Sequence, residues 1–172
     1  MANNIRPESF EIFGKIFFLS NRLEYLGDNE LRKDGLTTKQ WELIAVTGKY
    51  FTYPPSVSEV ADVLSTTRQN IKQLALKLQE KGFIILERDP KDRRVLRLRL
   101  TEKNRKYWES NSDEKIEFIS SLFSSLTDKE LKELYGLLNK LEENIDLRYK
   151  ETKSNFIGAI HITRATDLNI KE

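Results

Sequence analysis

Basic and amide side chains gather in one stretch of the chain, where they could bind a polyanion. Between Thr66 and Lys106 the sequence has 13 Lys and Arg residues against 5 Asp and Glu, a local balance of +8. The rest carries 16 basic and 22 acidic residues, so the net charge of the whole chain is only +2. Because each neutralised phosphate releases counterions, this asymmetry favours nucleic-acid binding. The alternative is a chance cluster of solvated charge.

One part of this stretch reads as a helix over 68–81 with an apolar face and a polar face. Glutamine and asparagine suit bidentate contacts with adenine, while arginine and lysine reach guanine or phosphate. The two threonines before the helix contact phosphate or cap it, and the last lysine reaches the DNA backbone at best. The alternative is the solvated face of an ordinary helix. The candidate DNA-binding residues here are Thr66, Thr67, Arg68, Gln69, Asn70, Lys72, Gln73 and Lys77.

A second group lies in the loop 89–94, which consists of turn formers and charge. Lys91, Arg93 and Arg94 are the candidate DNA contacts, since a guanidinium inserts well into a narrow, negative minor groove. Asp89 and Asp92 are expected to have structural roles: Asp89 closes the turn with the following proline, and Asp92 orients an arginine. The alternative is a plain solvated hairpin loop.

Local signals predict the elements that position these side chains. Ser56 and Glu59 have the spacing of a capping box, and Thr67 is the expected N-cap of the helix that Gly82 ends. Two short helices joined by a tight turn form a helix-turn-helix. Period-two alternation then predicts strands over 83–88 and 95–100, the second with a basic face, so the loop between them is the tip of a hairpin.

The flanking segments read as helices with a packing role. A helix from about Glu8 to Arg32 is apolar on more than one face, which predicts burial on two sides. Its phenylalanines therefore need a packing partner. A last helix begins at the capping box of Thr127 and Glu130, and 110–113 are poor helix formers. The candidate dimerisation residues are Phe10, Phe13, Phe17, Leu131, Leu134, Leu138, Leu141 and Ile145.

Composition excludes several kinds of site. The chain has no cysteine and a single histidine, which rules out thiolate chemistry and argues against a histidine-based zinc site or catalytic triad. No carboxylate pair, phosphate loop or nucleophile–base spacing stands out, so we expect no enzyme, no cofactor and no metal. The start of the chain lacks a signal-peptide pattern and no apolar run is long enough for a membrane span, which predicts a cytoplasmic protein.

The order of motifs resembles the MarR family of transcriptional regulators. The resemblance covers 36–105 through LTTKQW at 36–41, SEVA at 58–61, KGFI at 81–84, RDPKDRR at 88–94 and LTEK at 100–103. The 88–94 motif is its most specific part. The sequence departs from the family at Lys72-Gln73, where a Thr-Arg pair is frequent, and at Asn104, where glycine is usual. Asparagine also tolerates the left-handed conformation that glycine would supply there.

The resemblance implies an obligate homodimer that binds a pseudo-palindromic operator in double-stranded DNA. It further implies a repressor released by a small aromatic or lipophilic effector. The phenylalanines of the first helix then form the dimer core or, in the alternative, line the effector pocket. The expected fold is mainly α with a small two-stranded β-wing, a winged helix-turn-helix between N- and C-terminal dimerisation helices. The expected domains are 1–34, 35–101 and 102–150, with a tail of unassigned role over 151–172. The alternative is a winged-helix adaptor that docks on protein and does not read DNA.

Overall fold

The computed structural model describes the backbone of residues 6–110 and 112–168, and the side chains of 6–110 and 113–153. It divides into two compact units, 1–112 and 113–172. In the first unit the elements are α1 Pro7–Leu31, a 3-10 turn η1 Arg32–Asp34, α2 Thr38–Tyr50, α3 Val57–Val63, α4 Arg68–Glu80, β1 Ile84–Arg88, β2 Leu96–Leu100 and α5 Glu102–Ser110. The second contains α6 Ser112–Leu122, which starts at the boundary, and α7 Asp128–Leu168. The expected fold class, mainly helical with a two-stranded wing, is confirmed.

Side-chain caps define where the helices of the first unit begin. Thr37 caps α2, and Ser56 caps α3 in a reciprocal capping box with Glu59. The Thr67 hydroxyl oxygen accepts the Asn70 amide at 3.1 Å and starts α4, while Gly82 follows its end at φ +74°. Each cap satisfies amides that the first helical turn leaves free, which is why these starts were visible in the sequence.

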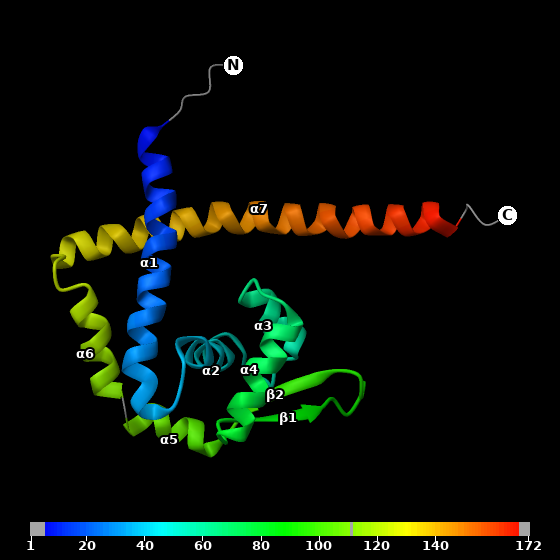
Figure 1. The fold of residues 1–172 in the computed structure, drawn as a ribbon, viewed down its shortest axis with the longest axis horizontal. Helices are drawn as coiled ribbons and strands as arrows, with labels where there is room; N and C mark the ends of the chain where they lie inside the picture. Colours follow the sequence, from blue (N-terminus) through cyan, green and yellow to red (C-terminus); the bar gives the residue numbers. More distant parts are fainter. Residues whose placement is uncertain (1–5, 111, 169–172) are drawn as a thin grey trace. The chain divides into compact units, whose positions relative to one another are not determined.

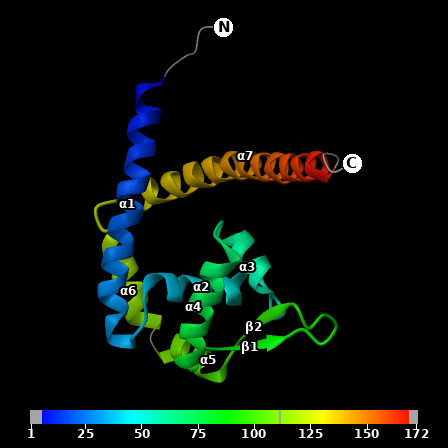
Figure 2. The ribbon, with the colours of Figure 1, turned by 45° about the vertical axis from the view of Figure 1, so that its right-hand side comes forward.

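The two strands form an antiparallel hairpin that is joined to the helices at its base. Ile84 pairs with Leu100 and Arg88 with Leu96, and the side chains of Ile84 and Leu98 are buried in the core. The Leu98 amide also donates to the Pro55 carbonyl at 2.8 Å, so the segment before α3 runs beside β2. Figures 1 and 2 show the hairpin projecting from α2, α3 and α4 with its loop pointing away from them.

Asn104 is helical and buried. It is the third residue of α5 and is 4% exposed, and Ser65 is the only non-glycine residue with positive φ in the described part of the chain. The left-handed conformation that asparagine tolerates is therefore not adopted at this position. Its amide lies 3.3 Å from the Thr101 hydroxyl oxygen, which accepts its hydrogen bond, so the position is set by the first turn of a helix.

The crossing of α1 and α2 is close and polar. The Thr38 hydroxyl donates to the Glu24 carbonyl at 3.0 Å, and the Thr38 amide donates to the Asp28 carboxylate at 2.7 Å. Gly27 lies against Thr38, where an added Cβ would come within 2.5 Å of the threonine oxygen. The direction of α1 relative to α2 is therefore fixed by contacts that tolerate no larger side chain at residue 27.

In the second unit, α7 starts at the predicted capping box. The Thr127 amide donates to the Glu130 carboxylate at 2.8 Å. The helix continues to Leu168, well into the segment 151–172 that the sequence set apart. The apolar stretch within that segment lies outside the residues with described side chains, and the predicted domain boundaries stay predictions. No helix of the described residues has both the length and the hydropathy that crossing a membrane requires.

We predict that Gly27→Ala lowers the free energy of unfolding by about 1–3 kcal/mol, because its methyl group overpacks the crossing with Thr38. Urea denaturation at fixed protein concentration measures the change. Gly136→Ala is the matched control, since a Cβ there meets nothing within 4 Å and alanine stabilises a helix by up to about 1 kcal/mol. Equal effects of the two substitutions would contradict the close crossing.

Candidate nucleic-acid interface

The polar face of α4 is open to solvent while its opposite face is buried. Ile71, Ala75 and Leu78 are 0% exposed and hold the helix in the core. Among the described residues Arg68, Lys72 and Lys77 have no ion-pair partner, so their charges stay free for a ligand. Thr66 is half-buried, and the candidates that are exposed on α4 and its N-cap are Thr67, Arg68, Gln69, Asn70, Lys72, Gln73 and Lys77.

Two of these candidates are already engaged within the chain. The Asn70 side-chain amide donates to the Thr66 hydroxyl at 3.1 Å, and the Thr67 hydroxyl oxygen caps the helix. A base contact by Asn70 would have to compete with its bond to Thr66. Gln69 and Gln73 are the amides on this face without such a bond among the described residues.

Asp89 organises the loop at the wing tip. Its Oδ1 atom accepts the amides of Lys91 at 2.7 Å and Asp92 at 3.0 Å, and its own amide donates to the Val95 carbonyl at 3.0 Å. The carboxylate is 9% exposed, so it faces the hairpin and not the solvent. An acidic residue beside a DNA-binding loop is explained by this structural role.

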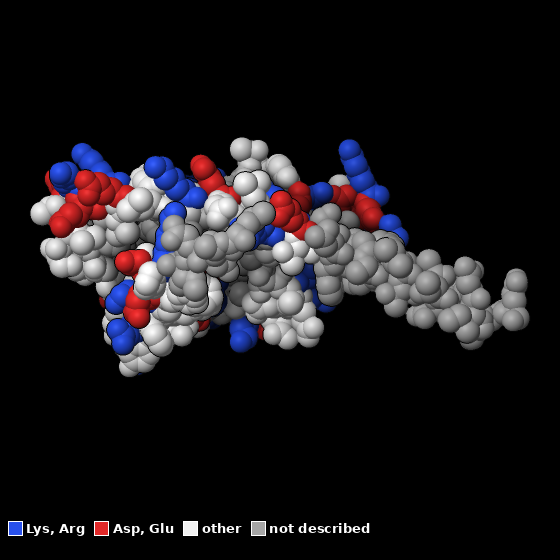
Figure 3. Space-filling model, turned by 90° about the horizontal axis from the view of Figure 1, so that it is seen from above, with Lys and Arg blue, Asp and Glu red and all other residues white. Residues whose placement is uncertain are grey.

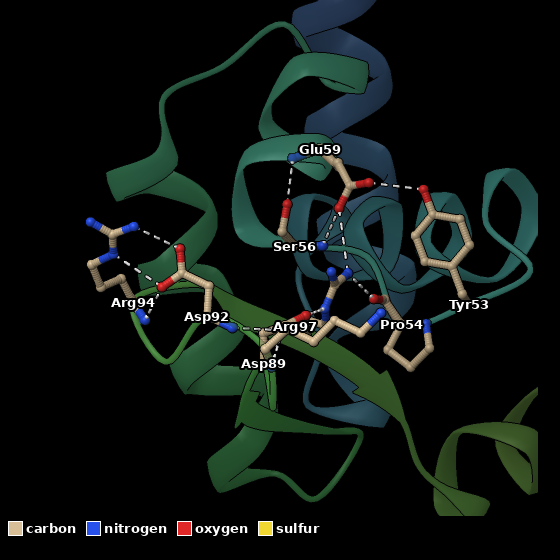
Figure 4. A network of polar contacts seen from close by, with 9 residues as sticks. Tyr53, Pro54, Ser56, Glu59, Asp89, Asp92, Arg94 and Arg97 are labelled. Carbon is tan, nitrogen blue, oxygen red and sulfur yellow. Dashed lines mark hydrogen bonds and ion pairs between the residues drawn. The ribbon is translucent and has the colours of Figure 1, made fainter.

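Asp92 holds Arg94, as drawn in Figure 4. The Arg94 Nε and Nη2 atoms donate to the two carboxylate oxygens at 3.0 Å each, yet the arginine side chain is 91% exposed. Arg93, also exposed, forms no ion pair among the described residues, and its carbonyl accepts the Arg88 guanidinium at 2.6 Å. The tip therefore presents one arginine fixed in direction and one that is free.

Arg97 connects the wing to the helix-turn-helix, a role that the sequence did not reveal. From β2 its Nε donates to the second carboxylate oxygen of Asp89, and its Nη1 donates to the Pro54 carbonyl at 2.9 Å. The same Nη1 lies 3.7 Å from the carboxylate of Glu59, the capping residue of α3. Figure 4 shows Arg97 between the loop and α3, with Tyr53 donating to Glu59 from the other side at 2.8 Å.

The basic face predicted on β2 is therefore largely neutralised. Besides Arg97, Arg99 pairs with Glu87 at 3.1 Å, and on α5 Arg105 pairs with Glu102 and Glu109. Lys81 donates to the Gln40 side chain at 2.7 Å and is partly buried, which lowers its pKa. Within 66–106, ion pairs engage four arginines, Arg94, Arg97, Arg99 and Arg105. The basic residues of α4 and, at the wing tip, Lys91 and Arg93 form none among the described residues, and neither do Lys103 and Lys106 on α5.

The hydrogen bonds also set the protonation of the acidic groups. The Arg97 side chain first, and then the amides of Asp92 and Lys91, lower the pKa of Asp89 from 3.8 to about 2. The Arg94 side chain and amide lower the pKa of Asp92, and the cap at Ser56 lowers that of Glu59. All three carboxylates are charged at neutral pH. Elsewhere, on the face in Figure 3, described side chains of both signs are interspersed.

A short helix, a tight turn, an exposed second helix and an antiparallel hairpin define the class of winged helix-turn-helix proteins. Residues 34–95 match the sequence model described as the MarR family. The chain is 26% identical over 173 residues to BadR of Rhodopseudomonas palustris, named a transcriptional activatory protein, with 97% of this chain and 95% of BadR covered. The chain is therefore similar to the MarR family of transcriptional regulators over residues 34–95, and to BadR along most of its length.

Solved structures agree with this assignment. A MarR/EmrR family transcriptional regulator from Acinetobacter sp. ADP1 has a TM-score of 0.68 and 26% identity, and the match covers 83% of this chain and 99% of that one. The S. aureus MepR–DNA complex has the same fold, with a TM-score of 0.67 at 20% identity over 77% of this chain and 97% of MepR.

We predict that Asp89→Asn destabilises the protein at neutral pH and that the difference from the wild type shrinks as the pH falls from about 4 towards 2. A carboxylate whose pKa is lowered in the folded state stabilises the fold above its unfolded pKa, and this stabilisation is lost as the pH falls through the folded value, here about 2. Denaturation between pH 7 and 2.5 tests this. The control repeats the Asp89→Asn substitution in an Arg97→Met background. The pH-dependent difference in the free energy of unfolding should be smaller there, because the main cause of the lowered pKa of Asp89 is absent.

Proposed function

We propose that this chain is a dimeric, sequence-specific DNA-binding transcriptional regulator. The observation that carries the proposal is the placement of free charge. Cations without an ion pair and free amides lie on α4 and on the wing tip, while the two arginines of β2 are paired with Asp89 and Glu87. The similarity to the MarR family of transcriptional regulators supports it, and the protein-docking adaptor is not favoured.

In the proposed complex the N-terminal half of α4 enters the major groove. Gln69 and Gln73 contact adenine edges there, and Arg68 or Lys72 reaches guanine or phosphate. Lys91, Arg93 and Arg94 follow the neighbouring minor groove, where a free guanidinium meets the strongest negative potential. Thr66, Thr67, Asn70 and Lys77 contact the DNA backbone in this proposal.

Exposed apolar side chains on α1 and α7 support the proposed dimer. On α1, Phe10 is 71% exposed, Phe13 64% and Phe17 57%, which is more than a helix of a stable monomer presents to water. On α7, Leu131, Leu138 and Ile145 are likewise exposed, and Leu134 and Leu141 are half-buried. We propose that a second copy of the chain covers these faces. Two copies would place two α4 helices for a pseudo-palindromic site with half-sites about 10 bp apart.

The sign of regulation follows from where the operator lies relative to the promoter. Repression is the sequence-based prediction, although the relative BadR is named an activatory protein. A small aromatic or lipophilic effector and a cytoplasmic location belong to the same proposal. An effector regulates DNA binding only if it binds one of two conformations of the dimer more tightly.

Footprinting of the gene's own upstream region at two salt concentrations tests the proposal. We expect protection of a pseudo-palindrome, with an affinity that falls steeply as the salt concentration rises. Arg93→Ala removes one proposed phosphate or minor-groove contact, and should weaken binding to all sequences and reduce the slope of log K against log salt by about 1.

Arg105→Ala is the matched control for the charge change, since Arg105 is paired with Glu102 and Glu109 on α5, away from the proposed contacts. It should leave the slope unchanged. No protection of any duplex, or equal slopes for the two variants, would contradict the proposed interface.

For the dimer, we predict that Phe17→Asp converts the protein to a monomer that no longer binds operator DNA. Burying the new carboxylate in an apolar interface carries a large desolvation cost. Sedimentation velocity measures the change in mass. Val63→Asp, at a residue 43% exposed on α3, is the matched control and should stay dimeric. A dimer that survives Phe17→Asp would remove α1 from the proposed interface.

A further inference from the structure

One apolar side chain lies on the exposed, polar face of α4. Leu76 is 42% exposed, whereas the other apolar side chains of this fully described helix are buried or half-buried. Residues three, four and seven apart share one face of an α-helix. Leu76 follows Gln69, Lys72 and Gln73 at these spacings, and all four side chains are exposed. They therefore form one row along the face of α4 that is opposite the core.

The charges around Leu76 indicate what covers it. Lys72 and Lys77 lie beside it on the helix, and both are exposed and without an ion pair among the described residues. Glu80, one turn further on, is acidic, so the part of the row suited to a polyanion ends at Leu76. A protein surface that covered Leu76 would also remove these ammonium groups from water, which is costly without an opposite charge. A DNA duplex supplies that charge through its phosphates.

The major groove of DNA also presents an apolar group that fits this position. Thymine is the only one of the four bases with a methyl group there, and apolar side chains contact it. Recognition helices read base edges with residues at positions i, i+3, i+4 and i+7, which is the spacing of Gln69, Lys72, Gln73 and Leu76. Each A·T pair shows the adenine edge and the thymine methyl group in the same groove. Glutamines placed for adenine and Leu76 therefore suit neighbouring A·T pairs.

We propose that Leu76 is a specificity-determining residue that packs against the 5-methyl group of thymine in the major groove. The inference rests on the proposed DNA binding and adds a base preference that hydrogen bonds and phosphate contacts do not supply. Burial of one methyl group changes the affinity by about fourfold, and by about tenfold when both half-sites of a dimer are counted. Because the contact is apolar, its contribution is independent of the salt concentration.

The test removes the methyl group and keeps the base pairing. The full chain first selects a duplex from a random-sequence pool, and deoxyuridine then replaces thymidine at one position after another. Fluorescence anisotropy measures the dissociation constants. We expect one thymine per half-site whose replacement weakens binding about fourfold, and about tenfold when it is replaced in both half-sites. This scan uses the unmodified protein, so it does not depend on the folding of any variant.

A substitution connects the methyl group to the leucine. Leu76→Ala should bind the thymine and uracil duplexes equally and leave the slope of log K against log salt unchanged. Val63→Ala, at an apolar residue 43% exposed on α3, is the matched control and should retain the difference. If no duplex is bound, the proposed DNA binding fails and this inference with it. Binding without a sensitive thymine, or a difference that persists in Leu76→Ala, overturns the role of Leu76 alone.

Discussion

The contacts of the Arg97 side chain are the interaction on which the geometry of the DNA-binding unit depends. A two-stranded hairpin is marginally stable alone, because it has no third strand and little core of its own. Arg97 holds it to Asp89 at the loop, to the Pro54 carbonyl and to Glu59 at the start of α3. The wing tip therefore keeps a fixed position relative to the helices. In the proposed complex, this fixed position lets α4 and the loop reach two grooves of one duplex together.

The same network decides which positive charges are free. An arginine with a carboxylate partner contributes little net field, whereas an unpaired one attracts polyanions over the Debye length. Arg97 and Arg99 form ion pairs with Asp89 and Glu87, and these pairs stabilise the wing. Among the described residues, cations without an ion pair remain on α4 and at the loop, and Lys103 and Lys106 remain on α5. Net charge along the sequence locates the basic module, and the unpaired cations of α4 and the loop outline the proposed binding surface within it.

Local signals in the sequence predicted the helices and strands, because caps such as Ser56 with Glu59 act within four residues. They could not predict the link from Arg97 to Pro54, whose partners are 43 residues apart. Alternation along β2 even suggested the opposite role, since it placed Arg97 and Arg99 together on a basic face. The signal that was available is the acidic Glu87 and Asp89 across the hairpin. The burial of Asn104, which is 4% exposed, also depends on tertiary packing and has no local signal.

The α1–α2 crossing connects the winged helix-turn-helix to α1. Thr38 is bonded to the carbonyl of Glu24 and the carboxylate of Asp28, and Gly27 allows the helices to touch. Because α2 packs on α4 through core residues such as Leu43 and Ile71, a rotation of α1 is passed to α4 and is not absorbed between them. If α1 forms the dimer interface, the spacing of the two α4 helices is set by this crossing.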